Sequence, residues 1–393
     1  CRIGRFVSGA FQGRRGWKYK VLRKNPFFTM GYGGPEYFCD RVAETNELIS
    51  ALVNGRNVAL ISPRGLGKKG LIHHVFHHLQ HDDSNRRCFY IDIYNTQNQQ
   101  ELVQLLAQTI VGSMDKFSEK IFTQLTTFFK SCRPVFSADP ITGAPEVTLD
   151  VQPQNSEYTL KEIVAYMNES EHECFVAIDE FQQIMEYPEK GTEALLRSVV
   201  QFAPNVHFIY AGSKQHLMSE MFTSPRRPFY QSTQHMGLKP LDENVYYEFA
   251  SRLMANGGKT LPKEVFAQAY HFAHGFTYYI QDIMNRLFAM PETEITIHQL
   301  QSVFQTLTNE GETVYKDYCD LLAKGQLKLL RAIAKEDVVE KPHEASFMLR
   351  HNLKAISSVK LALEAQLKNG VVAKGKQGYF IYDRYLSLWL RCA

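Results

Sequence analysis

The chain has 393 residues, of which 44% are hydrophobic and 22% charged, and its net charge is +3. That length predicts two or three domains, and the composition is ordinary for a soluble globular protein. No apolar run approaches the roughly 20 residues that cross a bilayer, and no apolar stretch near residue 1 precedes a small-residue cleavage site, so the sequence predicts neither a membrane segment nor a secretory signal.

The first part of the chain alternates predicted helices and strands. Apolar runs at residues 57–62, 88–93, 174–179 and 206–211, with a short one at 235–238, predict strands. Apolar side chains at helical spacing predict helices at residues 36–50, 68–80, 99–130 and 160–167. In the first of these helices, Val42, Leu48 and Leu52 are expected to face the core. Strands that alternate with helices predict a parallel sheet with helices on both faces, and the unbroken apolar run at 174–179 predicts a strand buried on both sides.

The remaining segments have other patterns. Residues 132–153 contain two strand-like runs around the turn-rich segment Asp139–Pro145, so we predict a β-hairpin insertion. Residues 240–312 show helical periodicity without strands. The C-terminal segment predicts three helices followed by a hairpin at residues 371–382, which is the pattern of a winged helix. Its apolar end, residues 385–390, is expected to be a helix that closes the wing onto the core.

Charge and cysteine content give further expectations. Residues 1–24 carry +8 and residues 324–393 carry +7, which leaves −12 for the rest of the chain. Basic ends favour contact with an anionic polymer, and a solvated surface is an equal alternative for the N-terminal arm. Because the sequence begins with Cys1 rather than Met, residues 1–24 are also considered as a segment foreign to the native fold. The seven cysteines are scattered without a Cys-x-x-Cys pair, which is typical of reduced thiols and predicts a cytoplasmic protein.

The turn after the first predicted strand contains a candidate phosphate-binding loop. It consists of Ser62, Pro63, Arg64, Gly65, Leu66, Gly67, Lys68, Lys69 and Gly70. In a glycine-rich turn between a strand and a helix, backbone N–H groups and the helix N-terminus point at phosphate oxygens. Gly67 allows the backbone to approach closely, and Lys68 supplies a charge between the β- and γ-phosphates. The motif is incomplete, because Ser62 and Lys69 stand where Gly and Ser or Thr are expected, so alone it is weak support for a nucleotide site.

A second motif strengthens that prediction. Residues 175–178 are apolar and run directly into Asp179 and Glu180, which is the Walker B arrangement of a buried strand that delivers carboxylates beside a P-loop. Asp179 is predicted to hold Mg²⁺, largely through water, and Glu180 to polarise the attacking water. An Asp-Glu pair can also be a plain strand end, but the two motifs together, with another strand between them, rarely arise by chance.

Further segments of the sequence agree with these motifs. They are Phe38-x-x-Arg41-x-x-Glu44-x-x-x-Leu48, Ser62-Pro63-Arg64, Gly67-Lys68, Ile178-Asp179-Glu180-Phe181-Gln182, Ala211-Gly212-Ser213, Asp139–Pro145 and Gly275–Gln281. Together they resemble the archaeal-type P-loop ATPases found in bacteria and archaea, which are relatives of the origin-recognition ATPases and of the STAND class. The resemblance covers roughly residues 25–390. It implies an AAA+-like α/β core with a parallel sheet of strand order 5-1-4-3-2, then a helical lid and a winged helix-turn-helix.

The resemblance also implies a domain division and residue roles. The divisions are a basic N-terminal extension (1–35), a P-loop ATPase core (36–239), a helical lid (240–315) and a winged helix (316–393), with nucleotide between core and lid. Ser213 resembles the sensor that contacts the γ-phosphate or the water, so the catalytic residues implied are Lys68, Glu180 and Ser213. Arg226 and Arg227 stand where a finger or sensor arginine could reach a phosphate; an exposed loop is the alternative, and it is favoured for this pair.

Lys69 is where the sequence departs from the family pattern, which has a Thr whose hydroxyl ligates Mg²⁺. An ammonium cannot ligate a cation, so Lys69 is predicted to weaken Mg²⁺ binding while it still attracts phosphate. We therefore expect an ATP- and ADP-binding protein that acts as a nucleotide-dependent switch, with ATP hydrolysis that is slow or lost. The alternative is a winged-helix regulator that binds DNA or a protein partner, or a second copy of itself, with an ATP site that is only structural.

Two more clusters are candidates for binding. Histidines at i,i+4 spacing follow the P-loop, namely His73, His74, His77, His78 and His81. Such spacing can hold zinc, but a polar helix face is favoured. In the winged helix, Ser357 and Ser358 are expected to cap a recognition helix at residues 359–368. Its cationic candidates for phosphate contact are Lys354, Lys360, Lys368, Lys374 and Lys376. Gln366 is the one amide of that helix suited to base edges, and DNA contact and protein docking are left as equal alternatives.

Overall fold

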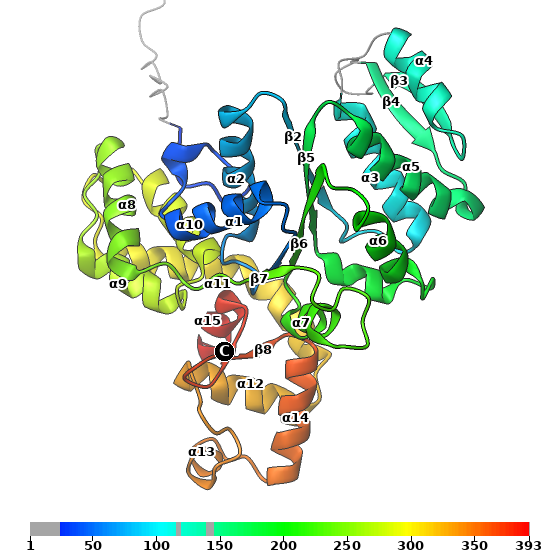
Figure 1. Ribbon diagram of the computed structural model, residues 1–393. Helices are drawn as coiled ribbons and strands as arrows, with labels where there is room; N and C mark the ends of the chain where they lie inside the picture. The colour runs from blue at the N-terminus through cyan, green and yellow to red at the C-terminus, as the bar shows by residue number, and fades with distance from the viewer. Residues whose placement is uncertain (1–23, 115–118, 139–144, 393) are drawn as a thin grey trace, which may run out of the picture.

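The structure is a computed structural model that describes residues 24–114, 119–138 and 145–392 (Figure 1). Most of the predicted basic arm, residues 1–23, lies outside the described residues, and so do residues 139–144 of the predicted turn-rich segment. The described residues form a core built on a sheet, a group of lid helices and a winged helix, which is the architecture that the sequence predicts. No helix among them has the length and apolarity needed to cross a membrane.

A five-stranded parallel sheet forms the centre of the core (Figure 1). Its strands are β1 (Val58–Ile61), β2 (Arg86–Asp92), β5 (Glu173–Asp179), β6 (Val206–Gly212) and β7 (Gln234–Met236). They lie in the order β2-β5-β6-β1-β7, and every neighbouring pair is parallel. When the core strands are counted along the chain without the hairpin insertion, this is the order 5-1-4-3-2, so the predicted topology is confirmed.

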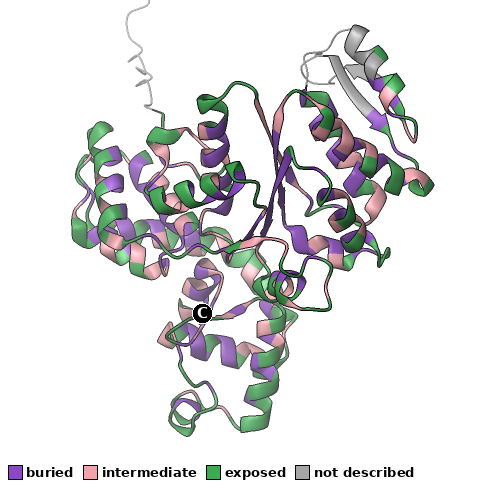
Figure 2. Ribbon diagram, in the orientation of Figure 1, coloured by how far each residue is buried: buried purple, intermediate pink, exposed green. Residues whose placement is uncertain are grey.

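Helices cover both faces of this sheet, which is why its central strands are buried along almost their whole lengths (Figure 2). The helices are α1 (Val42–Val53) and α2 (Lys68–Asp82) on one face, and α3 (Gln99–Met114), α5 (Ser156–Glu169), α6 (Thr192–Val200) and α7 (Gln215–Thr223) on the other. In β5, Phe175 and Ala177 pack into the first of these cores. Val176 and Ile178 pack into the second core, so the unbroken apolar run follows from burial on both sides.

One predicted helix starts later than its apolar pattern indicates. The helix expected at residues 36–50 begins at Val42, because Asp40 and Arg41 have φ values of +53° and +64°, which are incompatible with a right-handed helix. Val42 is therefore the first helical residue and is 63% exposed, contrary to the expectation that it faces the core. Leu48, which lies in the middle of the helix, is fully buried as expected.

The hairpin insertion is present and is anchored to the core. It consists of the antiparallel strands β3 (Arg133–Ala138) and β4 (Pro145–Asp150). Before it, the structure has α3 and a second helix, α4 (Glu119–Phe128), where the sequence predicts one helix over residues 99–130. Gln104 of α3 holds the hairpin, because its Nε2 donates to the Leu149 carbonyl at 2.6 Å and its Oε1 accepts from the Val151 N–H at 3.2 Å.

The lid and the winged helix follow the sheet. The lid comprises α8 (Glu243–Asn256), α9 (Lys263–Phe272), α10 (Thr277–Ala289) and α11 (Ile297–Asp320). The winged helix comprises α12 (Lys324–Glu336), α13 (Ala345–Arg350), α14 (Ile356–Lys368), β8 (Val372–Lys374), β9 (Tyr379–Ile381) and α15 (Arg384–Cys392). Short 3₁₀ segments lie at Pro35–Tyr37, Pro153–Asn155 and Phe181–Glu186. The winged helix has its own apolar core, and α15 packs against α11 of the lid (Figure 1). Arg384 Nε donates to the Phe272 carbonyl at 2.8 Å, so the predicted closing helix is bound to the lid.

Two expectations for the recognition helix are wrong. Helix α14 begins at Ile356 with Ala355 as its N-cap and without a side-chain cap, so Ser357 and Ser358 lie inside the first turn and do not cap it. Gln366 is fully buried, and its Oε1 accepts a hydrogen bond from the Tyr318 hydroxyl at 3.3 Å. A side chain in that position faces the domain's own core, so Gln366 is not available to a base edge.

Candidate functional site

The P-loop turn joins β1 to α2 at the carboxyl edge of the sheet. Gly65 and Gly67 have φ values of +78° and +89°, a region that residues with a Cβ rarely adopt, and Gly67 is the N-cap of α2. The N–H of the buried Ser62 donates to the Gly212 carbonyl at 3.2 Å, which ties the turn to the end of β6. The first N–H groups of α2 have no partner within the helix and carry the positive end of its dipole. The turn therefore has the geometry of an anion cradle.

Lys68, the first residue of α2, is directed into this cradle. Its side chain is buried, and its Nζ donates to the Ser62 carbonyl at 3.1 Å. Burial lowers the pKa of Lys68, and the nearby carboxylates of Asp179 and Glu180 act against that shift. A buried ammonium with two acids nearby and one carbonyl partner is a group that an incoming anion can bind.

Asp179 and Glu180 follow β5 at the same edge of the sheet. Asp179 is 1% exposed; its Oδ2 accepts from the Tyr90 hydroxyl at 2.6 Å, and its Oδ1 accepts from the Glu180 N–H at 2.9 Å. Burial, together with the charge of Asp179, raises the pKa of Tyr90 far above its usual range, so Tyr90 remains a hydrogen-bond donor. Glu180 has a φ of +56°, and such strained backbone is concentrated at functional sites.

The carboxylate of Glu180 is held by its neighbours. Its Oε2 accepts from Ser213 Oγ at 2.7 Å and from Gln182 Nε2 at 2.6 Å. Arg64 of the P-loop reaches the same group, with its Nε 3.3 Å from Ser213 Oγ and 3.6 Å from Glu180 Oε1. The predicted catalytic residues Glu180 and Ser213 are thus in direct contact, and the charges of Asp179 and Glu180 reach the Lys68 ammonium.

Lys69 lies next to the predicted metal ligand. Its Nζ is 2.6 Å from Asp92 Oδ2 and 3.8 Å from Asp179 Oδ2. Burial alone would lower the pKa of Lys69, but its hydrogen bond to Asp92 and the charges of Asp92 and Asp179 raise it. Sequence reasoning missed Asp92, although the signal was present: it ends β2 as Asp179 ends β5, and the two residues are register partners.

Residues from three other parts of the chain hold successive carbonyls of the turn. The Tyr382 hydroxyl of the winged helix donates to the Arg64 carbonyl at 2.8 Å. The Tyr278 N–H of the lid donates to the Gly65 carbonyl at 3.0 Å. Arg41, just before α1, donates through Nη2 to the Leu66 carbonyl at 3.2 Å and to the Lys239 carbonyl at 2.7 Å. The outward side of the turn is therefore bound by protein.

The remaining candidates from the sequence are engaged elsewhere. Arg227 is 2.5 Å from Glu193 of α6 and 3.7 Å from Glu220 of α7, while Arg226 is exposed. His74 stacks on Phe38 with ring centroids 4.1 Å apart and bonds the Tyr32 hydroxyl. No group of three or more His, Cys, Asp or Glu side chains in the described part of the chain is arranged to hold a metal ion. His74 thus packs against aromatic rings, while His77 and His81 are exposed on the helix.

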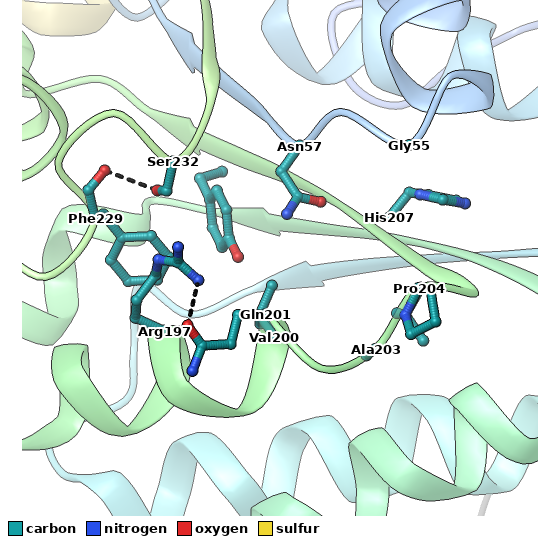
Figure 3. A pocket seen from close by; sticks show the side chains of 12 residues that line it. Gly55, Asn57, Arg197, Val200, Gln201, Ala203, Pro204, His207, Phe229 and Ser232 are labelled. Carbon is teal, nitrogen blue, oxygen red and sulfur yellow. Dashed lines mark hydrogen bonds between the residues drawn. The ribbon is translucent and has the colours of Figure 1, made fainter.

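A cavity of about 260 Å³ lies at the opposite edge of the sheet (Figure 3). It is lined by residues before β1, by α6, β6 and the loop between them, and by Phe229 and Ser232 before β7; the lining includes Asn57, Arg197, His207 and Tyr210. The Tyr210 hydroxyl is buried without a hydrogen-bond partner among the described residues. None of the predicted site residues lines this cavity.

Comparisons with known proteins agree with the fold described above. Residues 313–392 match a family described as a probable winged helix domain. Among solved structures, the chain is similar to the Walker-type ATPase PABY2304 of Pyrococcus abyssi, with 19% identity and a TM-score of 0.62 over 93% of this chain and 99% of that chain. The chain shares the fold of this ATPase. No curated protein matches the sequence.

Two further solved structures share this fold, with somewhat lower identities and TM-scores. The ORC2 protein of Aeropyrum pernix, solved as ADPNP and ADP complexes, has 14% identity and a TM-score of 0.54 over 89% of this chain and 92% of that chain. The ORC1 protein of the same organism, solved in complex with DNA, has 12% identity and a TM-score of 0.51 over 91% of this chain and 93% of that chain. At these identities the fold is what is shared, so the predicted AAA+-like core, lid and winged helix are confirmed as a fold.

Proposed function

We propose that the protein binds ATP and ADP at the P-loop. The observation that carries the proposal is the meeting of Lys68, the N-terminus of α2 and the acids of β5 at the carboxyl edge of a parallel sheet. Ligands bind at that edge in open α/β sheets, and a helix N-terminus with a buried ammonium favours phosphate. The nucleotide complex of the ORC2 protein, which shares the fold, supports the same assignment.

Nucleotide affinity of the full chain tests this proposal. We expect calorimetry and anisotropy of a fluorescent ATP to detect binding of both ATP and ADP. Lys68→Ala should weaken binding by about tenfold or more, because it removes a charge-assisted hydrogen bond to phosphate. Lys161→Ala is the matched control, since Lys161 is an exposed helical lysine paired with Glu157. Wild-type protein that binds neither nucleotide by either method would refute the proposal.

We further propose that the bound nucleotide is a signal to the lid and the winged helix. A phosphate in the cradle competes with the Lys68 bond to Ser62 and with the Arg64 contact to Glu180. The carbonyls on the outward side of the same turn are held by Tyr278 of the lid and Tyr382 of the winged helix. A rearrangement of the turn therefore changes contacts with both domains. Hydrogen exchange of α10 and β9 with and without ATP tests this, and identical exchange in the two states would contradict it.

The winged helix carries a second candidate function, which is contact with nucleic-acid phosphates. Lys360 and Lys368 are exposed on α14, and Lys374 and Lys376 are exposed on the wing. The burial of Gln366 removes the amide that could distinguish bases, so we propose binding that does not depend on sequence. Affinity for unrelated duplexes should be equal and should fall steeply with salt. A single preferred duplex, or affinity that salt leaves unchanged, would contradict this proposal.

A further inference from the structure

The carboxyl edge of the sheet holds two acids in adjacent positions. Asp92 ends β2 and Asp179 ends β5, and the two residues are direct register partners in neighbouring parallel strands. Asp179 is fully buried, while the side chain of Asp92 is 34% exposed. Two carboxylates so placed repel each other unless a cation or hydrogen-bond donors lie between them. In a P-loop ATPase such acids commonly help to hold a divalent cation.

In this chain the cation beside them is a side chain. Lys69 Nζ lies 2.6 Å from Asp92 Oδ2 and 3.8 Å from Asp179 Oδ2. The Tyr90 hydroxyl donates to the same Asp179 oxygen at 2.6 Å, and Lys69 Nζ lies 5.8 Å from the centre of the Tyr90 ring. The Lys69 ammonium thus offsets one of the two negative charges, and the neutral Tyr90 phenol donates a hydrogen bond to Asp179.

This donor set does not fit Mg²⁺. Magnesium requires near-octahedral oxygen ligands, and a P-loop supplies one from a Ser or Thr hydroxyl at the position of Lys69. The Lys69 ammonium has no lone pair to donate and repels a divalent cation from Asp179. The two carboxylate oxygens of Asp179 are engaged by the Glu180 N–H and the Tyr90 hydroxyl, and Asp92 Oδ1 accepts from the Tyr94 N–H at 3.1 Å.

Lys69 can also exchange its Asp92 partner for a phosphate. Its side chain is 58% exposed and follows Lys68 directly at the start of α2. A four-carbon stem with an exposed ammonium can turn from Asp92 towards an anion in the cradle, where it would stand beside Lys68. In that arrangement the helix would present two ammonium groups and its own dipole to the same phosphates.

We propose that Lys69 is a built-in replacement for the divalent cation, so that this site binds adenine nucleotide without Mg²⁺. The inference rests on the proposed nucleotide site. Nucleotide affinity should be highest in EDTA and should fall in excess Mg²⁺, because Mg²⁺ sequesters free ATP while the bound nucleotide carries no metal. The protein would then respond to nucleotide itself rather than to its magnesium complex.

The test measures nucleotide and metal separately in the full chain. A fluorescent ATP is titrated in EDTA and in Mg²⁺, and electron paramagnetic resonance follows Mn²⁺ in the presence of ATP. The variants are Lys69→Thr, which restores a hydroxyl, Lys69→Met, which removes only the charge, and Lys161→Thr as a control on an exposed helical lysine. Circular dichroism melts confirm that each variant is folded.

We expect wild-type protein and Lys161→Thr to bind ATP more tightly in EDTA than in excess Mg²⁺ and to hold no Mn²⁺. Lys69→Thr should bind ATP more weakly than wild-type protein in EDTA, by about tenfold or more. In Mg²⁺ it should regain its affinity for ATP, and it should hold Mn²⁺. Lys69→Met should be weakened in both conditions. Wild-type protein that binds ATP only with Mg²⁺, or that holds Mn²⁺ beside ATP, would overturn this inference and leave the nucleotide site intact. Wild-type protein that binds ATP in neither condition would overturn both.

Discussion

Asp337 joins the lid to the winged helix, and its substitution gives a direct test of how the two domains are held together. It is the C-cap of α12, with a φ of +65°. Its carboxylate accepts hydrogen bonds from Arg384 and Arg391 of α15 and lies 3.0 Å from Nε2 of His274, in the turn before α10. Arg384 is fully buried and also donates to the Phe272 carbonyl of the lid. One carboxylate therefore balances the charge of a buried guanidinium at the junction of the two domains.

Asp337→Asn should open this junction. Removal of one partner from a buried ion pair costs about 3–5 kcal/mol, because it leaves an uncompensated charge. The Asp337 side chain is 35% exposed, so solvent screening reduces the expected cost to about 2–3 kcal/mol. That corresponds to a roughly 30- to 150-fold increase in the population of the opened junction. We expect the increase in hydrogen exchange to be confined to α12, α15 and the turn at His274.

Hydrogen exchange followed by mass spectrometry measures this effect segment by segment. Asp317→Asn is the matched control, because Asp317 is an exposed acid on α11. The sheet should exchange alike in all three proteins. If α12 and α15 exchange in Asp337→Asn as slowly as they do in wild-type protein, the junction does not depend on this carboxylate and the reasoning from the buried Arg384 fails.

Four further outcomes follow from the described contacts. Glu180→Gln should lower any ATP turnover by about 100-fold or more while nucleotide affinity changes by less than about threefold, as measured by phosphate release and calorimetry, since Glu180 is the proposed base. Lys69→Thr should raise turnover in the same assay, because it removes the ammonium beside Asp179; unchanged turnover in a protein that hydrolyses ATP would contradict this. Tyr210→Phe should leave the urea midpoint unchanged or raise it, because the lost hydroxyl is buried without a partner, and a clear loss of stability would mean that water in the cavity binds it. Burial alone would raise the pKa of Asp337, but hydrogen bonds from His274 and Arg384 hold that pKa well below its usual range. The stabilisation by Asp337 is therefore present above the ordinary carboxyl pKa of about 3.9 and is lost as pH falls through the lower folded value. The difference in urea midpoint between wild type and Asp337→Asn should thus be constant near neutral pH and shrink only in strong acid.

Local patterns in the sequence were enough to predict the sheet and the cradle. The unbroken apolar run before Asp179 predicts a strand buried on both faces, and that is what β5 is. A glycine-rich turn is predicted between the first strand and its helix; it is present, and Gly65 and Gly67 have positive φ in it. Both predictions succeed because the controlling physics, which is burial and the absence of a Cβ, belongs to the residues themselves.

Predictions that depend on distant contacts failed. The start of α1 is set by Arg41, whose positive φ accompanies hydrogen bonds to Leu66 and Lys239, far along the chain. The burial of Gln366 depends on Tyr318 of the lid's last helix, α11, which no periodicity within α14 reveals. Asp92 was missed for a related reason, since its importance comes from the strand register that puts it beside Asp179.

The P-loop turn is held by both local and distant interactions, and these interactions limit how the turn can respond to a ligand. The N–H groups at the start of α2 face the cradle, whereas the carbonyls of Arg64, Gly65 and Leu66 are bound from outside. Each of these three carbonyls is held by a different part of the chain: the winged helix, the lid and the segment before α1. Successive peptide units are rigid planes, so a rotation that brings an N–H group towards a phosphate also turns the carbonyl of the preceding residue. The turn cannot adjust to a ligand without changing at least one of these outer bonds, each worth about 0.5–1.5 kcal/mol. In the proposed switch, energies of this size would be reversible and would change the balance between two positions of the winged helix by roughly two- to tenfold.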